Sequence, residues 1–439
     1  MKRITLFISC LFLVISLKPN IYKVTPTGSG NQDGSSWSNA MPITAVESTI
    51  RSAPASDSEF WLSQGTYTSK VFDYNNAVAQ VPVCKIYGGF AGDNDAETVE
   101  TRNWKNNVTI LDGGGAIQAI KYVPGGTAFP HDGKVVIDGV TFYRNCDLTK
   151  DYAMTVTFKG SLTISNCIFY ECQAKRGVIQ WNSNVPGVQG TVTIVNCLFY
   201  NNTITGIATN PSSAIIQIAN STGNIVNCTM ADNIISSPSQ NVALGIISGM
   251  GNSTLNVVNN IIYNHTGVTD YSVSKIEGLS TAQVDNVFYS KNNASDLSMA
   301  GSDNTVLLST PFVDGSYAID TTGGSVCVDM GDNTSYLPAY PLKDLAVNDR
   351  ILNGRIDLGA YESSIPTGVR TVDTSSVYAY RNKSKIYVKS ESGELIQVYT
   401  LQGIKVAEII AKSNLTVFDL SFLDVDKVVL KIPNTSFVL

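Results

Sequence analysis

The stretch Thr-Ile-Ser-Asn-Cys-Ile-Phe-Tyr-Glu-Cys at residues 163–172 returns almost unchanged as Thr-Ile-Val-Asn-Cys-Leu-Phe-Tyr-Asn-Asn at 193–202. Looser versions of this phrase occupy residues 136–145, 224–233, 256–265 and 283–289. Successive phrases are 26 to 32 residues apart when aligned on Gly139, Asn166, Asn196, Asn227, Asn259 and Asp285. A period in this range is typical of stacked repeats, because one repeat cannot bury its apolar face alone.

Apolar residues alternate with period two inside each phrase, which predicts short strands with one buried face. The column two positions after the cysteines consists of Phe142, Phe169, Phe199, Met230, Ile262 and Phe288. No apolar stripe follows the helical period, so helical repeats are disfavoured. A repeat of about 30 residues accommodates three short strands and three turns. We therefore predict an all-β fold, a right-handed single-stranded parallel β-helix.

Two columns of polar residues also recur at fixed places in the coils. The first column consists of Asn166, Asn196, Asn227 and Asn259. The second column consists of Asn145, Cys172, Asn202, Asn233 and His265. Asn tolerates the left-handed backbone of a tight bend, and stacked amides can hydrogen-bond along the coil axis. We expect the first column to lie at one bend of successive coils, and His265 to substitute structurally for Asn in the second.

The remaining sequence predicts how the chain is divided. Ile43, Val46 and Ile50 form the apolar face of a short helix that could cover the open end of the first coil. Short strands separated by turn residues in the last 60 or so positions suggest a small β-sandwich. The expected parts are a signal peptide at 1–18, the N-terminal cap and first coils at 21–112, regular coils at 113–311, terminal coils at 312–362, a linker at 363–378 and the sandwich at 379–439.

The N-terminus has the pattern of a secretory signal, with Lys2 and Arg3 before an apolar run over residues 4–17. Cleavage after Ser16 and lipid attachment at Cys10 are the two alternatives there. No later stretch has the roughly 18 apolar residues of a membrane-spanning helix. The net charge of −6, with only 15% charged residues, gives no basic stripe for binding nucleic acid. The expected location is therefore extracellular or on the outer cell surface.

Seven cysteines remain after the signal peptide, so at least one is unpaired within the chain. Export would permit disulfides between Cys167, Cys197 and Cys228. Stacked strands, however, hold neighbouring Cβ atoms about 4.8 Å apart, farther than the roughly 3.8 Å that a disulfide prefers. We therefore expect buried free thiols. No Cys-x-x-Cys pair indicates a zinc site, and no metal site is predicted.

Several segments resemble right-handed parallel β-helix proteins secreted by Bacteroidetes, of the pectate-lyase-like fold. The segments are residues 22–37, residues 87–90 with 109–113, the coil phrase itself, and residues 325–332 with 357–362. The last of them resembles the end of choice-of-anchor β-helix proteins. Residues 398–406 resemble the C-terminal sorting domain of type IX secretion cargo, although the chain ends on Leu439 where such domains usually have a basic residue. The resemblance implies the fold, export, and secretion machinery as a partner.

A column of tyrosines follows the phenylalanine column by one position and should point outward. It consists of Tyr143, Tyr170, Tyr200, Tyr263 and Tyr289. Aromatic rings at about 5 Å intervals could stack on sugar rings or anchor a protein partner. Alternatively, the rings pack on one another and on overlying loops, since outward apolar residues are common. Ala231 interrupts the column.

Charged residues gather in the loops of two neighbouring coils. They are Asp147, Lys150, Asp151, Glu171, Lys175 and Arg176. A glycoside hydrolase needs paired carboxylates, and a polysaccharide lyase needs a Lys or Arg base beside carboxylates that bind calcium. The alternative is that these are solvated loop charges, because a perturbed site cannot be inferred from sequence.

The leading hypothesis is an exported, adhesin-like protein that binds a glycan or a cell-surface partner without catalysis. The first alternative is a lyase or hydrolase that acts on acidic polysaccharide through the charged loops, with calcium as cofactor only if it is a lyase. The second alternative is a structural protein of the cell envelope. No other cofactor is expected.

Overall fold

The computed structural model describes residues 19–52, 57–75, 83–123, 132–157, 160–183, 190–205, 212–236, 243–251, 253–266, 276–277, 281–285, 288–290, 305–307, 309–321, 327–352, 354–363, 378–382, 385–389, 393–400, 403–411, 416–420, 428–432 and 435–438. The predicted signal peptide with Cys10 and residues 364–377 of the predicted linker lie outside these residues. None of the helices in the described ranges is both long and apolar enough to cross a membrane.

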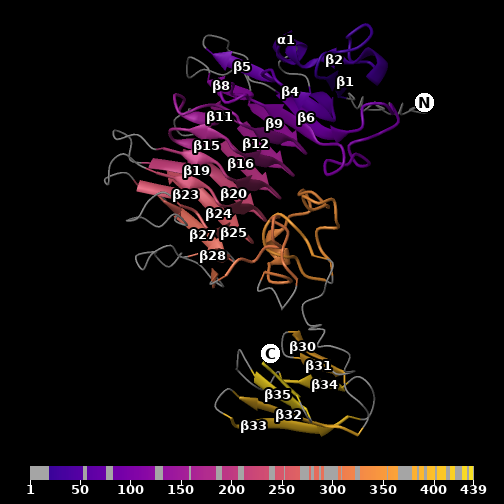
Figure 1. Ribbon diagram of the computed structural model, residues 1–439, viewed down its shortest axis with the longest axis vertical. Coiled ribbons are helices and arrows are strands. Elements are labelled where there is room, and N and C mark those ends of the chain that lie inside the picture. Colours follow the sequence, from indigo (N-terminus) through magenta and orange to yellow (C-terminus); the bar gives the residue numbers. More distant parts are fainter. Residues whose placement is uncertain are drawn as a thin grey trace, which may run out of the picture.

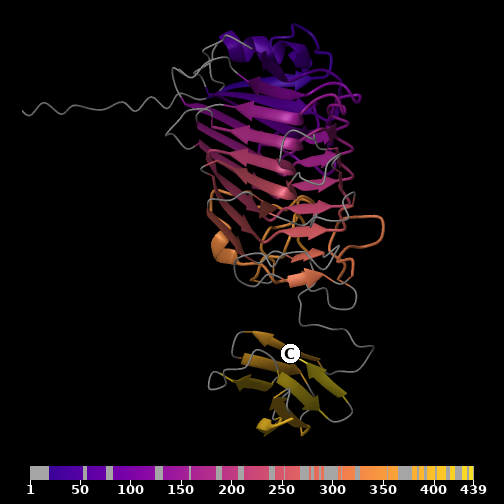
Figure 2. The same cartoon turned by 90° about the vertical axis from the view of Figure 1, so that its left-hand side faces the viewer.

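Three long parallel sheets wind around one axis, and the predicted parallel β-helix is confirmed (Figure 1 and Figure 2). Sheet A consists of β2 (Met41–Pro42), β1 (Asn20–Thr25), β3 (Ser58–Ser63), β6 (Val83–Phe90), β9 (Gly133–Asp138), β12 (Gly160–Ser165), β16 (Gly190–Val195), β20 (Ser221–Val226), β24 (Thr254–Val258) and β27 (Thr281–Asp285). Sheet B consists of β4 (Gly65–Tyr67), β7 (Thr109–Asp112), β10 (Thr141–Tyr143), β13 (Ile168–Tyr170), β17 (Leu198–Tyr200), β21 (Thr229–Ala231), β25 (Ile261–Tyr263), β28 (Phe288–Ser290) and β29 (Thr305–Leu307).

Sheet C consists of β5 (Phe72–Asn75), β8 (Ile120–Val123), β11 (Tyr152–Thr157), β15 (Gly177–Asn182), β19 (Ser212–Ala219), β23 (Ala243–Met250) and β26 (Ile276–Glu277). A short corner sheet joins β14 (Gln173–Ala174), β18 (Thr203–Ile204) and β22 (Ile234–Ile235). Each regular coil passes through sheets C, A and B in turn. Equivalent residues of successive phrases are paired between neighbouring strands, as residues 163–165 are with residues 193–195.

The interior is a continuous core built from the predicted apolar columns. The phenylalanines of the column two positions after the cysteines stack face to face, with ring centroids 4.5 Å apart between Phe142 and Phe169 and 4.8 Å between Phe169 and Phe199. Cys167, Cys197 and Cys228 are buried free thiols, as predicted. At the N-terminal end, η1 (Trp37–Asn39), η2 (Ile43–Ala45) and α1 (Val46–Ser52) precede the first full coils. Ile43, Val46 and Ile50 join the core, so this segment caps the β-helix as expected.

The first polar column lies at the bend between sheets A and B, with left-handed φ angles of 50° to 59° at Asn166, Asn196, Asn227 and Asn259. Gly139 takes the same place in the preceding coil with φ 72°. A Cβ there would lie 2.5 Å from Nη1 of the buried Arg102, which explains glycine at this rung. The predicted amide ladder is present in part. Amide hydrogen bonds join Asn196 to Asn166 and Asn259 to Asn227.

The second polar column lies inside the coil, and its hydrogen bonds run from rung to rung. Asn202 donates to Oδ1 of Asn233 over 2.9 Å, and the backbone N–H of Asn233 donates to Nδ1 of His265 over 3.1 Å. Burial lowers the pKa of His265 to about 3, so its imidazole is neutral and accepts as an Asn amide oxygen would. The prediction that His265 replaces Asn structurally is confirmed.

Of residues 312–362, expected to form terminal coils, the described part (312–321, 327–352 and 354–362) instead runs back along the outside of the β-helix. This segment, here called the strap, contains η3 (Asn333–Ser335) and no strand among its described residues. It is the orange chain beside the coils in Figure 1. Carbonyl oxygens of the strap accept from the first polar column, from Asn196 to Lys343 over 2.9 Å and from Asn227 to Asp357 over 2.7 Å. The strap follows this course because the amides of the first polar column face outward and donate to its carbonyl oxygens. The repeat pattern of the sequence carries no signal for these contacts, so the prediction missed them.

Close approach at Gly359 holds the strap on sheet B. A Cβ at this position, where φ is 76°, would lie 2.5 Å from Oγ1 of Thr229 and 2.8 Å from Cδ1 of Ile261. The neighbouring Ala360 N–H donates to the same Thr229 hydroxyl over 3.0 Å. The strap is itself tied by buried Arg350, whose Nη2 lies 3.3 Å from Oε2 of Glu362. Burial raises the pKa of Glu362 to about 8, although Arg350 opposes that rise.

The C-terminal module consists of two antiparallel sheets that share one core, as the predicted sandwich requires. One sheet contains β30 (Tyr378–Asn382), β31 (Lys385–Lys389) and β34 (Thr416–Asp419). The other contains β33 (Lys405–Ile410), β32 (Leu395–Thr400), β35 (Val428–Ile432) and β36 (Thr435–Val438).

Candidate functional site

The outer face of sheet B holds the tyrosine column, and its rings stack on one another. The centroids of Tyr143 and Tyr170 lie 4.4 Å apart with planes 15° apart. Those of Tyr170 and Tyr200 lie 5.1 Å apart with planes 1° apart. Both faces of Tyr170 are therefore covered by its neighbours. What the column offers to solvent is ring edges and hydroxyl groups, so sugar rings cannot stack on its faces.

Arg144 closes the N-terminal end of this stack. Its guanidinium carbon lies 4.5 Å from the ring centroid of Tyr143. The same group donates from Nε and Nη2 to the two carboxylate oxygens of Asp112 over 3.2 Å and 2.5 Å. Asp112 precedes Tyr143 in the column, because these residues are paired between β7 and β10. Burial favours the neutral form of Asp112, but Arg144 and a backbone N–H from Gly114 keep its pKa below the usual range.

The strap covers the other end of the column. Tyr317 lies on Tyr200 with ring centroids 4.8 Å apart and donates its hydroxyl to Oδ2 of Asp232 over 2.8 Å. Farther along, Phe312 meets Tyr263 edge to face at 5.9 Å. The alternative that outward rings pack on one another and on overlying chain therefore describes Tyr200 and Tyr263. Burial raises the pKa of Tyr200 to about 12, and its hydroxyl stays neutral.

Tyr289 does not take the place expected of it. The register of β25 and β28 pairs Ile261 with Phe288 and Ile262 with Tyr289. This register is shifted by one residue from the alignment of the phrases. Tyr289 therefore stands at the register position of Ile262 and not of Tyr263, and its binding role stays a prediction.

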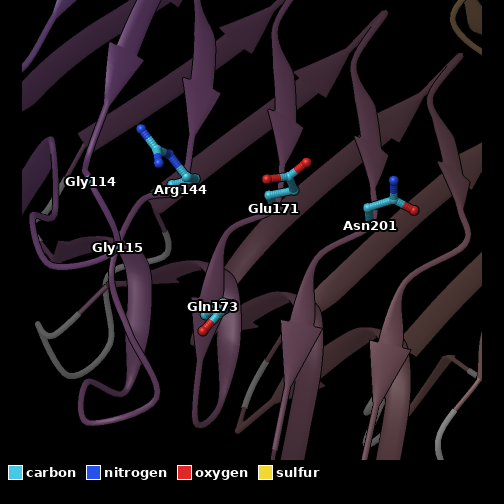
Figure 3. A pocket seen from close by; sticks show the side chains of 6 residues that line it. All are labelled: Gly114, Gly115, Arg144, Glu171, Gln173 and Asn201. Atoms are coloured by element: carbon cyan, nitrogen blue, oxygen red, sulfur yellow. The ribbon is translucent and has the colours of Figure 1, made fainter.

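A shallow polar hollow of about 180 Å³ lies beside the tyrosine stack (Figure 3). Its lining residues are Gly114, Gly115, Arg144, Glu171, Gln173 and Asn201. Arg144, Glu171 and Asn201 stand at the ends of successive strands of sheet B, each directly after a tyrosine. Their φ angles are 46°, 51° and 52°. A left-handed conformation is uncommon for Arg and Glu, so these side chains are displayed by a strained bend that the coil imposes.

The side chains in this hollow differ in whether they already form hydrogen bonds within the protein. Those of Glu171, Gln173 and Asn201 are exposed and make no hydrogen bond to any described residue, whereas Arg144 is paired with Asp112. A carboxylate can accept hydrogen bonds from the hydroxyls of a ligand, and an amide can both accept from them and donate to them. The hollow therefore holds three hydrogen-bonding side chains without a partner among the described residues, and its carboxylate, Glu171, forms no ion pair within them.

A second hollow of about 190 Å³ lies across the tyrosine stack, where the strap meets the coils. Its lining residues are Trp104, Lys105, Val108, Gly139, Thr141, Asn166, Ile168, Leu345, Ala346 and Tyr361. The indole of Trp104 donates to the carbonyl oxygen of Leu345 over 3.2 Å, which fixes one wall. Sheet B thus presents an open stretch, from β7 to β13, with a mostly apolar hollow on one side and a polar hollow on the other.

The six charged candidates do not come together. Glu171 lies in the polar hollow, whereas Lys150, Asp151, Lys175 and Arg176 lie in the corner before sheet C. In that corner Arg176 Nε is 3.7 Å from Asp151 Oδ2, and backbone hydrogen bonds join residues 150–151 to 175–176. Asp147 accepts from the backbone N–H of Thr149 over 2.7 Å, an ordinary turn. Within the described residues, no group of three His, Cys, Asp or Glu side chains is placed to hold a metal ion.

Sequence reasoning missed Arg144, Gln173 and Asn201 as site residues, as well as Trp104 and Tyr361. A signal for part of the set was present, because the position after the tyrosine column is polar in five coils, four times after a tyrosine and once after Ala231. These residues are Arg144, Glu171, Asn201, Asp232 and Asn264. The second hollow carried no signal, since it is assembled from a loop and the strap, far apart in the sequence.

Comparison with known proteins adds little to this geometry. No protein-family model matches the chain, and no curated protein matches it. A solved structure described as pectate lyase Pel9A aligns with 78% of this chain and 96% of its own, at 14% sequence identity and a TM-score of 0.30. A similarity at that level carries no argument about activity. The protein's class is defined by its own architecture: it is a parallel β-helix protein with a C-terminal β-sandwich module.

Proposed function

We propose that this is an exported β-helix protein that binds a glycan, without catalysis, across the open stretch of sheet B. The observation that carries the proposal is the polar hollow beside the stacked tyrosines. There Glu171, Gln173 and Asn201 have no hydrogen-bond partner within the described chain. Polar groups held on rigid strands in this way are preorganised for a hydroxyl-rich ligand, which reduces the entropy lost on binding.

The charges favour a neutral glycan over an acidic one. Arg144 is the cation among the residues that line the hollow, and it already donates two hydrogen bonds to Asp112. Glu171 remains as an exposed anion in the same hollow. A uronate ligand would therefore meet a like charge without a free cation to offset it, and like charges at short distance are unfavourable. Ring edges and hydroxyls of Tyr143 and Tyr170 would contribute contact area and further hydrogen bonds.

A glycan array tests the proposal. Fluorescently labelled full-length chain should be retained by neutral oligosaccharides, and the Glu171→Ala/Asn201→Ala variant should lose that retention. Asn31→Ala/Asp93→Ala is the matched control, because it removes an exposed amide and an exposed carboxylate that line neither hollow. Equal retention by all three proteins would contradict the proposal.

The enzyme alternative has a separate test. Incubation of the chain with uronate polysaccharides, with and without added calcium, should give neither unsaturated products nor new reducing ends. Release of either product, if abolished by Asp151→Asn or Glu171→Gln, would establish the lyase or hydrolase instead.

A further inference from the structure

The second hollow, where the strap meets the coils, has a different lining from the polar hollow and takes no part in the proposed glycan site. Its apolar walls come from segments far apart in the sequence and consist of Trp104, Val108, Ile168, Leu345, Ala346 and Tyr361. Four of these side chains, Trp104, Ile168, Leu345 and Tyr361, pack in one apolar cluster. The hollow measures about 190 Å³, and an engineered apolar cavity of about 150 Å³ is large enough to bind benzene. The second hollow therefore has room for one aromatic ring.

The walls of this hollow are held in place before any ligand binds. The indole Nε1 of Trp104 donates to the carbonyl oxygen of Leu345 over 3.2 Å, and the guanidinium carbon of buried Arg102 lies 4.9 Å from the indole ring centroid. On the strap side, Val347 follows Ala346 with a φ of 67°, a left-handed conformation that is strained for a residue branched at Cβ. Strain of this kind persists where the surrounding structure imposes it, and it is concentrated at binding sites. A wall that is already fixed reduces the entropy lost when a ligand binds.

The polar groups around the hollow are hydrogen-bond donors, and one of them is positively charged. The Lys105 ammonium forms no hydrogen bond and no ion pair with a described residue. The hydroxyl groups of Thr141 and Tyr361 make no hydrogen bond to a described residue either. None of the described residues that line the hollow is Asp or Glu, and Asp138, behind the wall, is paired with Arg102. The hollow thus favours a ligand that is apolar over most of its surface and carries a negative charge.

We infer that this hollow binds a small aromatic carboxylate. A ring beside Trp104 and Tyr361 gains the offset or edge-to-face contacts that aromatic pairs prefer, and it covers Val108, which is 39% exposed. The single cation of Lys105 matches the single charge of a carboxylate, and the hydroxyl groups of Thr141 and Tyr361 supply further donors. Apolar and aromatic walls with a few polar groups are typical of small-molecule sites. This inference does not depend on the proposed glycan binding.

Saturation-transfer NMR with cinnamate and cinnamamide tests the inference, because the two probes share a shape and differ in charge. The full-length chain should transfer saturation to the ring protons of both probes in a saturable manner. We expect cinnamate to bind about fivefold more tightly, a ratio that corresponds to about 1 kcal/mol for an exposed ion pair. Lys105→Gln should remove this preference. Lys134→Gln is the matched control, because Lys134 is an exposed lysine of β9 that lines neither hollow, and it should keep the preference.

Ala346→Phe places a ring inside the hollow and should abolish the binding of both probes. Lys105→Gln changes only an exposed side chain, so the test stays decisive even if Ala346→Phe loosens the strap. Absence of saturable transfer from the wild-type chain to cinnamate would overturn the inference. Equal affinity of the wild-type chain for cinnamate and cinnamamide would overturn it as well, and so would cinnamate binding that Ala346→Phe leaves unchanged.

Discussion

Tyr317 of the strap packs against Tyr200 of the β-helix, with ring centroids 4.8 Å apart and planes tilted by 43°, in the space that the tyrosine column leaves open at Ala231. Ala231 is fully buried although it stands in an outward column, because the strap covers it. An apparent break in the sequence pattern is therefore where a distant segment packs on the column. This contact also divides the flank into a closed part, under the strap, and the open part that holds the proposed site.

Removing the Tyr317 ring should loosen the strap. Tyr317→Ala leaves an aromatic-sized gap over Ala231 and deletes the hydrogen bond to Asp232. For a half-buried aromatic we expect a loss of about 2 kcal/mol, below the 3–5 kcal/mol of fully buried rings. Denaturant unfolding followed by tyrosine fluorescence measures it. Tyr317→Phe, which keeps the ring, should lose only the smaller hydrogen-bond contribution; equal losses for both variants would show that the ring contact contributes nothing.

The bend at Asn196 combines a left-handed backbone with amide hydrogen bonds to the strap. Its Nδ2 donates to the Tyr336 hydroxyl and to the Lys343 carbonyl, each over 2.9 Å. Asn196→Leu should cost about 3 kcal/mol, because it loses these bonds and forces a branched residue into the left-handed region. Asn196→Gly keeps the backbone conformation and should cost less. The difference between the two melting curves separates backbone strain from hydrogen bonding, and an unchanged melting temperature for Asn196→Leu would refute the ladder.

His265 should make the β-helix sensitive to acid. Burial lowers its folded-state pKa to about 3, below the ordinary value of 6.5 in the unfolded chain. A group of this kind contributes stability that is complete above pH 6.5 and is lost as the pH falls toward 3, because the unfolded chain takes up the proton first. His265→Asn should therefore lose less stability than wild type between pH 6.5 and 4. Parallel pH profiles of the two proteins would contradict this account.

Variants of Tyr170 distinguish the structural role of the tyrosine stack from a role in glycan binding. Both faces of its ring are covered by Tyr143 and Tyr200. Tyr170→Phe keeps the stack and should unfold as wild type does, while any loss of glycan retention would report on the hydroxyl alone. Tyr170→Ala should destabilise the chain by about 1–3 kcal/mol, since it leaves a gap in a half-buried stack. If Tyr170→Ala were as stable as wild type, the stack would have no structural role.

The sequence predicted the coils well because their information is local and repeated. A residue such as Asn196 meets the same residue type one rung away, so the alternation and period determine both its bend and its neighbours. The repeated columns likewise predicted buried free cysteines and the structural role of His265. Loss of the repetition explains why the register at Tyr289 was not predicted, because the last phrase matches the others weakly and its register shifts by one residue.

The strap and the site depended on contacts that have no local signature. Nothing in the phrase shows that the first polar column donates outward to residues 343 and 357, more than 100 positions later. The tyrosines were correctly placed on an outward face, yet the spacing that brings them close also covers their ring faces. The polar residues that follow them were visible in the sequence, but only the geometry of the bend shows that Glu171 and Asn201 line one hollow.

Titration calorimetry measures the proposed binding most directly. A neutral oligosaccharide that retains the chain on the glycan array is titrated into the full-length chain. We expect saturable binding to wild type, unchanged in Asn31→Ala/Asp93→Ala and lost in Glu171→Ala/Asn201→Ala at equal folded fraction. Binding of the same strength to the Glu171→Ala/Asn201→Ala variant, or tighter binding of a uronate oligosaccharide than of the neutral one, would contradict the assignment of this hollow.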